Sequence, residues 1–499
     1  MFGQRNSVYT PWPRSEEFSK CSHCLNTYFT MSSSRHIYYV AREMFIACLL
    51  AGVGMVVAGC YIDMLKSSGT LTSKEESIFE IIPPILGLKG NLEVALSSRL
   101  ATVVHFRRKF NELSFWLFTT TLAFILVLAV FASTIIPLVV ITLHKSSGTS
   151  HFPVDLVHLI CISSMTCICA TCFIGVVVYA IVRACVFCGA NPDNVAPPAA
   201  AALGDLVTVL IISHVNYYFI MHPTLTVTVA MCMISVVLIL SISYLLYYSN
   251  VNVSGDLLSL IITPNTFKET IIPLTLAIIM SSICGNISAR FLIDWPIIAR
   301  LQVPINGVGG IFGSMLISRM TTRLHSITFT VEKVNTVNSD RKSTTHNSHF
   351  YTSSQSFETL GSCRKVLEIH TDVSRVSKLI RFLCVPLHFA LTLVSLTVSY
   401  YLKQDNSPKI TSPLQFDILF PYLIAGFIQI CILLEFAKWI VLKLWKYLHS
   451  TKHLNSHGNV ISLASIDFSA IAVTTGAGDL IGTSLFILFL SISKWIISG

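Results

Sequence analysis

The stretch GLKGNLEVALSSRLATVVH, residues 87–105, occurs a second time in altered form as GVGGIFGSMLISRMTTRLH, residues 307–325. The two segments align without a gap at an offset of 220 residues. Two glycines, a Ser-Arg pair and the final histidine fall at matching positions. A match of this length predicts that one structural unit is present twice in the chain.

A second pair of segments repeats in the same order. ALGDLVTVL, which contains Asp205, resembles AGDLIGTSL, which contains Asp479. Twelve residues before each of these aspartates lies another, Asp193 in the first copy and Asp467 in the second. Because two unrelated segments repeat in the same order, the sequence predicts an internal duplication.

The composition is that of a membrane protein. Of the 499 residues, 53% are hydrophobic and only 12% are charged, whereas soluble domains carry about 25% charged residues. The formal net charge of +9 would suit a nucleic-acid partner. Its lysines and arginines, however, gather between the apolar runs, where they orient a membrane protein, so no nucleic-acid partner is expected. The sequence predicts a polytopic protein whose surroundings are the lipid bilayer.

Eleven apolar runs are long enough to cross a bilayer, which takes about 20 residues of helix. They lie at 43–64, 78–104, 113–142, 154–183, 197–221, 224–248, 270–293, 296–324, 379–402, 415–441 and 467–495. Spans one to five and seven to eleven form the two copies, and the sixth joins them. Since five is an odd number, the additional span gives both copies the same orientation in the membrane. We therefore predict an all-α membrane protein of eleven transmembrane helices, built as two parallel five-helix repeats in a monomer with internal pseudo-dimer symmetry.

These runs divide the chain into four parts. We expect a cytoplasmic N-terminal segment at 1–42, the first repeat at 43–221, a linker helix at 222–269 and the second repeat at 270–499. Residues 326–375 are rich in Ser and Thr and poor in large aliphatic side chains. Such a segment cannot bury enough apolar surface to order itself, so we expect a mobile cytoplasmic loop there.

Positive charge predicts the orientation of the chain. If the N-terminus is cytoplasmic, the inner segments hold most of the lysines and arginines, as the positive-inside rule requires. These residues are Arg5, Arg14, Lys20, Arg35, Arg42, Arg107, Arg108, Lys109, Lys333, Arg341, Lys342, Arg364, Lys365, Arg375, Lys378, Lys443, Lys446 and Lys452. The charge therefore predicts that the N-terminus is in the cytoplasm and the C-terminus outside. The membrane in which we expect the protein is the plasma membrane.

Asp205 and Asp479 lie inside predicted spans, where an ionisable side chain costs at least about 2.5–3.5 kcal/mol. One explanation is local: each carboxylate caps a helix or bonds a neighbouring hydroxyl, and Thr208 and Thr483 lie within reach one turn further on. The other explanation is that the two carboxylates bind a cation. A chance capping residue need not recur in the equivalent span, so the repetition favours cation binding.

The other pair of aspartates lies too far away to share that ion. Asp193 precedes Asp205 by about 18 Å if the chain between them is helical. In the segment Asn191-Pro-Asp-Asn194, Asp193 is expected either to concentrate cations at the inner mouth of a pathway or to cap a helix. Asp467 takes the equivalent position in the second copy.

The segment 87–105 supplies further oxygen atoms. Gly87 and Gly90 allow close approach between helices, Asn91 offers an amide oxygen and Glu93 a carboxylate. Alternatively, Glu93 only neutralises Lys89, which lies four residues earlier on the same helix face. Hard oxygen ligands without His or Cys suit Mg²⁺ or Ca²⁺. Asn91 and Glu93 therefore join the four aspartates as candidate metal ligands.

Four segments resemble solute carrier family 41, the animal relatives of bacterial MgtE magnesium transporters. They are PPILGLKGNLEVALSSRLAT, NPDNVAPPAAAALGDL, PINGVGGIFGSMLISRMTT and GAGDLIGTSL, in that order. The resemblance covers roughly residues 43–495. It implies two MgtE-type repeats around one pore, with Mg²⁺ held by Asp205 and Asp479 from the fifth span of each repeat and by Asn91 from the second span.

The second repeat departs from this pattern. The usual GGN is Gly309-Gly310-Ile311 here, and Gly313 stands opposite Glu93. If the ion lies between the two halves, the second span of the first repeat is expected to supply more of its ligands.

Two other classes of protein compete with a transporter. An intramembrane aspartyl protease carries a GxGD motif, which Gly476-Ala-Gly-Asp479 matches, but its Tyr-Asp pair and Pro-Ala-Leu motif do not occur in the chain. A non-transporting receptor or scaffold would leave the duplicated aspartates unexplained. We therefore expect a magnesium transporter and not an enzyme, with channel and Na⁺-coupled exchanger both open and Na⁺ as the second candidate ion.

Overall fold

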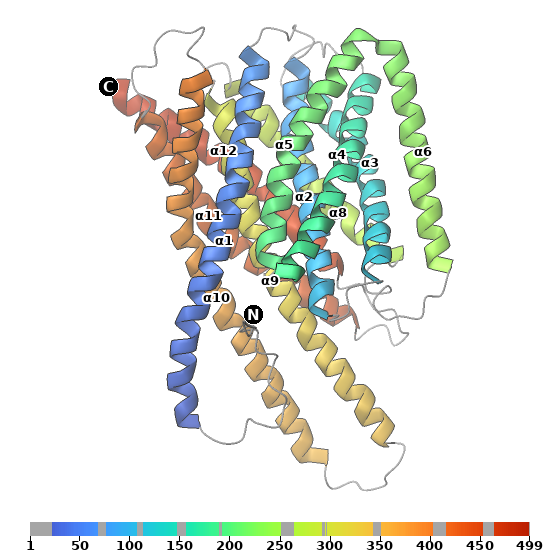
Figure 1. Cartoon of the computed structure of the whole chain (residues 1–499), viewed down its shortest axis with the longest axis vertical. Helices are drawn as coiled ribbons and strands as arrows, with labels where there is room; N and C mark the ends of the chain where they lie inside the picture. Colours follow the sequence, from blue (N-terminus) through green and yellow to red (C-terminus); the bar gives the residue numbers. More distant parts are fainter. Residues whose placement is uncertain are drawn as a thin grey trace, which may run out of the picture.

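The computed structural model describes residues 22–67, 76–106, 113–146, 156–188, 192–250, 264–291, 295, 297–342, 351–402, 416–452 and 464–498. Every regular element within these residues is an α-helix (Figure 1). The helices are α1 (Ser22–Ser67), α2 (Glu76–Phe106), α3 (Leu113–Ser146), α4 (Leu156–Cys188), α5 (Pro192–Met221), α6 (Pro223–Asn250), α8 (Pro264–Phe291), α9 (Ile297–Lys342), α10 (Tyr351–Leu402), α11 (Phe416–Lys452) and α12 (Ala464–Ser498). Each of the eleven predicted spans coincides with one of these helices, and the predicted all-α membrane fold is confirmed.

α2 differs from the other helices in its polarity. Ten of the described helices are long and apolar enough to cross a membrane, and α2 is the one that falls short. It carries Glu80, Lys89, Glu93 and Arg99. Yet α2 packs on α4 and α5 of the first half and on α8 and α12 of the second, and every side chain from residue 91 to residue 100 is buried. Protein, and not lipid, surrounds Lys89, Glu93 and Arg99.

The helices pack in two matching sets. In the first half α5 contacts α1, α2 and α4, and in the second half α12 contacts α8, α9 and α11. The halves interlock, because α1 packs against α9 while α8 packs against α2. This correspondence is the arrangement that a duplicated chain requires.

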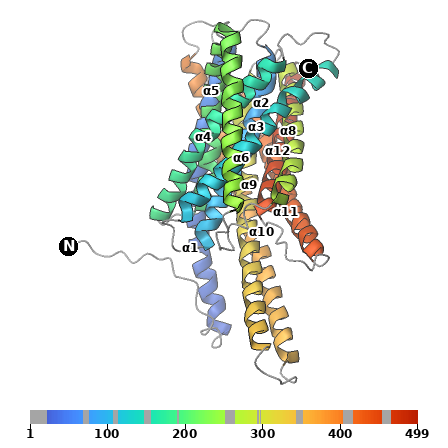
Figure 2. The same cartoon turned by 90° about the vertical axis from the view of Figure 1, so that its right-hand side faces the viewer.

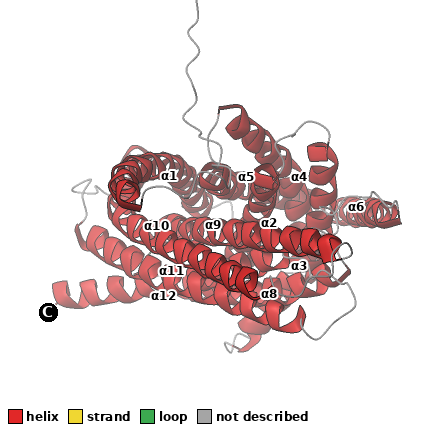
Figure 3. Ribbon diagram, turned by 90° about the horizontal axis from the view of Figure 1, so that it is seen from below, coloured by secondary structure: helices red, strands yellow, loops and turns green. Residues whose placement is uncertain are grey.

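α6 connects the two halves and lies at the edge of the bundle (Figures 1 and 3). Its main packing partners among the described elements are α3, α4 and α5, all in the first half. Its large apolar side chains point outward, with Ile239, Leu240 and Tyr247 each more than half exposed. Outward-facing apolar side chains are typical of a helix that contacts lipid.

Two serines from equivalent positions meet between the halves. Ser98 of α2 donates a hydrogen bond to Ser318 of α9, with an Oγ–Oγ distance of 3.1 Å. The two residues are 220 positions apart, which is the offset of the repeat. A residue contacts its own counterpart on a two-fold axis, so an axis relating the two halves would pass through this contact.

Two glycines allow helices from opposite halves to approach closely. A Cβ atom on Gly59 of α1 would collide with the backbone carbonyl of Arg300 in α9, and one on Gly285 of α8 would lie 3.0 Å from the backbone carbonyl of Glu80 in α2. Arg300 and Glu80 are themselves equivalent at the repeat offset. Arg300 also forms an ion pair with Asp63 of α1, so both close backbone packing and charge hold α1 against α9.

The loop expected at 326–375 is mostly helical. α9 continues to Lys342 and α10 begins at Tyr351, and the two helices project side by side beyond the bundle (Figure 2). Residues 326–342 contain neither Pro nor Gly, so they can extend a helix that the apolar part has already nucleated. The prediction of a loop is therefore wrong for these residues, because polarity keeps a segment out of the bilayer without preventing it from being helical.

Candidate functional site

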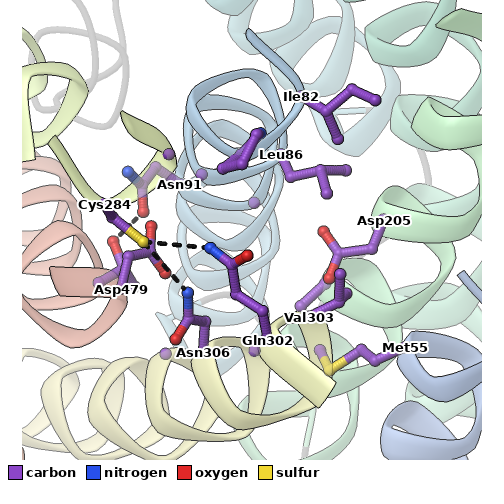
Figure 4. Close-up of a pocket in the computed structure, with 18 of the residues that line it drawn as sticks. Met55, Ile82, Leu86, Asn91, Asp205, Cys284, Gln302, Val303, Asn306 and Asp479 are labelled. Atoms are coloured by element: carbon purple, nitrogen blue, oxygen red, sulfur yellow. Dashed lines mark hydrogen bonds between the residues drawn. The ribbon is translucent and has the colours of Figure 1, made fainter. Parts of the chain in front are cut away.

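A cavity of about 110 Å³ lies between the two halves (Figure 4). α1, α2 and α5 of the first half line it together with α8, α9 and α12 of the second. The polar residues of its wall are Asn91, Asp205, Cys284, Ser288, Gln302, Asn306, Thr475 and Asp479. One water needs roughly 10–15 Å³ of such space, so a cation together with part of its hydration shell fits inside.

Asp205 and Asp479 both line this cavity, from opposite sides (Figure 4). The Asp205 side chain is only 7% exposed, and among the described residues it has neither a hydrogen bond nor an ion pair. The hydroxyl of Thr208 is likewise without a hydrogen-bond partner, and the hydroxyl of Thr483 bonds Asn306 and not Asp479. The local explanation therefore fails for Asp205, whereas Asp479 does accept a hydrogen bond from a neighbouring hydroxyl, that of Ser281 in another helix.

The two aspartates have different neighbours. Ser281 of α8 donates a hydrogen bond to Asp479 Oδ2 at 2.7 Å. Both groups lie beside Gly87, where a Cβ atom would stand 2.7 Å from Ser281 Oγ and 2.8 Å from Asp479 Oδ2. The equivalent glycine, Gly307, faces the thioether of Met55 instead. The second half therefore provides a hydroxyl donor where the first half provides sulfur and methylene groups.

Asn91 lies in the wall of the cavity, as the sequence predicted for an oxygen ligand. Its side chain is 3% exposed, and its Oδ1 atom accepts a hydrogen bond from the Thr475 hydroxyl of α12. An amide oxygen has two lone pairs, so one remains for a second interaction. The contact also ties α2 of the first half to α12 of the second.

Glu93 does not line the cavity, although it follows Asn91 by only two residues. Its Oε1 atom forms an ion pair with Lys89 Nζ at 2.7 Å, and Lys89 Nζ also donates to Thr171 Oγ1 of α4 at 2.8 Å. The Glu93 carboxylate lies against Gly204, in space that a Cβ atom there would occupy. The expected neutralisation of Glu93 by Lys89 is present, on the side of α2 that faces α4 and α5.

Asp193 and Asp467 lie near the beginnings of α5 and α12. Their side chains are outside the part of the structure that is described, so their roles stay predictions. Of the six candidate ligands, the cavity brings together Asn91, Asp205 and Asp479.

Five polar residues of the cavity were not predicted from the sequence, namely Cys284, Ser288, Gln302, Asn306 and Thr475. Gln302 and Asn306 of α9 face the cavity (Figure 4), and at the repeat offset they correspond to Ile82 and Leu86 of α2. The sequence does contain a signal for these two residues. Gln302 and Asn306 lie four residues apart in the run ARLQVPINGVGG, a spacing that places both amides on one face of a helix.

The donor set of the cavity limits the ions that it suits. No group of three His, Cys, Asp or Glu side chains with the geometry of a metal site occurs among the described residues. A cation in the cavity would therefore meet two carboxylates, neutral oxygens and water. That combination suits hard cations that keep part of their hydration shell.

Comparison with known proteins finds the same family that the sequence motifs indicated. Residues 82–215 match the family model MgtE, described as a divalent cation transporter, and this range runs from α2 to α5 and includes Asn91 and Asp205. Solute carrier family 41 member 3 of Rattus norvegicus is 28% identical over 92% of this chain and 88% of its own length. The Mus musculus member 3 is also 28% identical, over 92% and 84%. Solute carrier family 41 member 2 of Xenopus laevis is 25% identical over 92% and 72%.

Among solved structures, a crystal structure of a MATE mutant aligns with 91% of this chain and 96% of that chain at 15% sequence identity. Its TM-score of 0.20 is too low to indicate a common fold.

Proposed function

We propose that this cation transporter, which is MgtE-like and related to solute carrier family 41 along most of its length, carries Mg²⁺ through the cavity between its two halves. The observation that carries the proposal is the pair Asp205 and Asp479, which come from opposite halves and line one cavity. The Asp205 carboxylate has no partner in the described protein, so a cation from the cavity is the group available to neutralise it. A single chain supplies both carboxylates.

Mg²⁺ fits the chemistry of this cavity better than a transition metal does. It prefers hard oxygen ligands and keeps several of its waters, so one or two carboxylates are enough to hold it. Two carboxylates also balance the charge of a divalent ion. Na⁺ remains the candidate for a coupling ion. In a Na⁺-coupled exchanger the Na⁺ gradient drives Mg²⁺ transport, whereas in a channel it does not.

Reconstituted full-length protein tests this function directly. Proteoliposomes loaded with a Mg²⁺ indicator should take up Mg²⁺ faster than protein-free liposomes. A dependence of the rate on an opposing Na⁺ gradient would identify an exchanger, and independence would identify a channel. Absence of Mg²⁺-dependent flux from well-folded protein would favour the receptor or scaffold alternative.

The proposed orientation places the N-terminus and residues 326–375 in the cytoplasm and the C-terminus outside. This follows from the positive-inside rule. The end of α9 and the beginning of α10 lie on the same side of the bundle (Figure 2). In intact cells, a single cysteine introduced at Ser343 should not react with a membrane-impermeant maleimide, whereas one introduced at Ser498 should. Labelling of residues 340–355 from outside intact plasma membranes would reverse the topology.

Asn91→Ala should raise the half-saturating Mg²⁺ concentration for transport by about tenfold, which corresponds to ~1.4 kcal/mol of lost interaction. The reason is that Asn91 places an amide oxygen in the cavity wall, whereas its counterpart Ile311 has no oxygen to offer. Ile311→Ala should change protein yield and melting temperature with little effect on affinity, because it removes buried apolar volume. Equal losses of affinity in the two variants, at equal protein levels, would show that Asn91 has no ligand role.

A further inference from the structure

The second half gives the cavity an amide pair that the first half lacks. Gln302 and Asn306 of α9 stand where α2 has Ile82 and Leu86, and all four residues line the cavity. The cavity is therefore polar on its α9 side and apolar on the matching part of α2. This difference is independent of the pair Asn91 and Ile311.

Cys284 of α8 fixes the orientation of both amides. Its fully buried sulfur lies 3.3 Å from Gln302 Nε2 and 3.6 Å from Asn306 Nδ2, and each nitrogen donates to it. The sulfur also lies 3.1 Å from Thr483 Oγ1 of α12. Thiol sulfur is a weak acceptor, but in this buried position it is the acceptor that the Gln302 N–H group reaches.

The orientation of the amide decides which atom of Gln302 meets a cation. With Nε2 directed at Cys284, Oε1 is at the opposite end of the amide, and no hydrogen bond to Oε1 occurs among the described residues. The side chain is 8% exposed, and its amide group lies between Asp205 and Asp479 in the cavity (Figure 4). Asn306 differs, because both ends of its amide contact the Thr483 hydroxyl, at 3.0 and 3.2 Å.

We propose that Gln302 Oε1 is a ligand of the transported divalent cation, directly or through one of its waters, and that Cys284 is a positioning residue that turns this oxygen toward the ion. The proposal rests on the function proposed above. An amide oxygen adds coordination without adding charge, so with two carboxylates the site stays neutral around a divalent ion. Sulfur takes no part as a ligand, because hard cations prefer oxygen.

The test uses full-length protein in proteoliposomes, with Mg²⁺ as the probe. Gln302→Ile copies the first-half residue Ile82, and Gln302→Met keeps the length of the side chain while removing its oxygen. Both should raise the half-saturating Mg²⁺ concentration by about tenfold while changing the maximal rate much less. Ile317→Val changes a buried side chain of the same helix outside the cavity; it is the control and should leave the affinity unchanged.

Cys284 is tested through its dependence on Gln302. Cys284→Ala should raise the half-saturating Mg²⁺ concentration, and Cys284→Ser, which keeps an acceptor for the amide nitrogen, should restore it. In the Gln302→Ile background, Cys284→Ala should add no further loss, because Gln302 is gone and the Thr483 hydroxyl still holds both ends of the Asn306 amide. An additional loss there would overturn the positioning role.

Melting temperature in detergent separates this inference from the proposed function. Mg²⁺ should raise the melting temperature of the wild type, because a ligand that binds the folded state stabilises it, and it should do so less for Gln302→Met. Equal stabilisation and equal affinity in Gln302→Met, with a responsive wild type, would overturn the role of Gln302 alone. A wild type that neither binds nor transports Mg²⁺ would overturn the proposed function itself.

Discussion

Asp205→Asn and Asp479→Asn should each reduce Mg²⁺ uptake by at least about tenfold, the factor that corresponds to ~1.4 kcal/mol of lost binding. An amide has no net charge, so either variant faces a divalent cation with one negative charge where the wild type has two. In a cavity with a low dielectric constant this difference is larger than it would be in water. Uptake in proteoliposomes, normalised to reconstituted protein, is the measurement.

The same two variants should differ in stability. Asp205 has no hydrogen-bond or ion-pair partner in the described protein, and a buried charge without a partner destabilises the fold. In Mg²⁺-free buffer, Asp205→Asn should therefore melt at a higher temperature than the wild type. Asp479→Asn should change the melting temperature less, because an amide oxygen still accepts the Ser281 hydrogen bond. Added Mg²⁺ should stabilise the wild type and neither variant.

Thr208→Val is the matched control for Asp205. The two side chains share a helix face one turn apart, and the Thr208 hydroxyl has no hydrogen-bond partner. Removing it should leave transport unchanged. Wild-type uptake in both aspartate variants at normal protein levels would show that Asp205 and Asp479 have a structural role and do not bind the transported ion.

Lys89→Met alone should prevent most of the protein from folding. It leaves the Glu93 carboxylate buried without its ion-pair partner, and breaking a buried pair in this way costs about 3–5 kcal/mol. The double variant Lys89→Met with Glu93→Gln removes both charges and should recover most of the folded protein. Size-exclusion profiles and melting temperatures of the tagged protein measure the effect.

Transport by the double variant decides whether Glu93 is also a ligand. If Glu93 only neutralises Lys89, the double variant should transport Mg²⁺ better than either single variant. A double variant that folds well and has lost its Mg²⁺ affinity would place Glu93 among the ligands. The packing of its carboxylate against Gly204, next to Asp205, makes this arm of the experiment necessary.

The sequence predicted the helices and the three residues that meet in the cavity, for physical reasons that differ. Long apolar runs must be helical in a bilayer, since no other open structure satisfies the backbone there. Asp205 and Asp479 were found because an aspartate in such a run is costly and because it recurs. Asn91 was found through the resemblance and through its place beside two glycines.

What the sequence could not show depends on rotation about the helix axis. Asn91 and Glu93 are two residues apart, which puts them on different faces of α2, and only packing decides which face meets the cavity. The same holds for Gln302, whose role depends on Cys284 in another helix. The helical parts of 326–375 were missed because composition predicts exposure to water better than it predicts backbone conformation.

The polarity of α2 has a consequence for the order in which the protein is assembled during synthesis. A segment with this many charged groups partitions poorly into lipid by itself, so α2 depends on its neighbours to stay in the membrane. Two of these, α8 and α12, belong to the second half, and α12 begins only at Ala464, more than 350 residues after α2 ends at Phe106. The enclosure of α2 is thus complete only after α12 has been synthesised, and a chain truncated before Ala464 would leave a charged helix partly uncovered in the bilayer, as a substrate for membrane quality control.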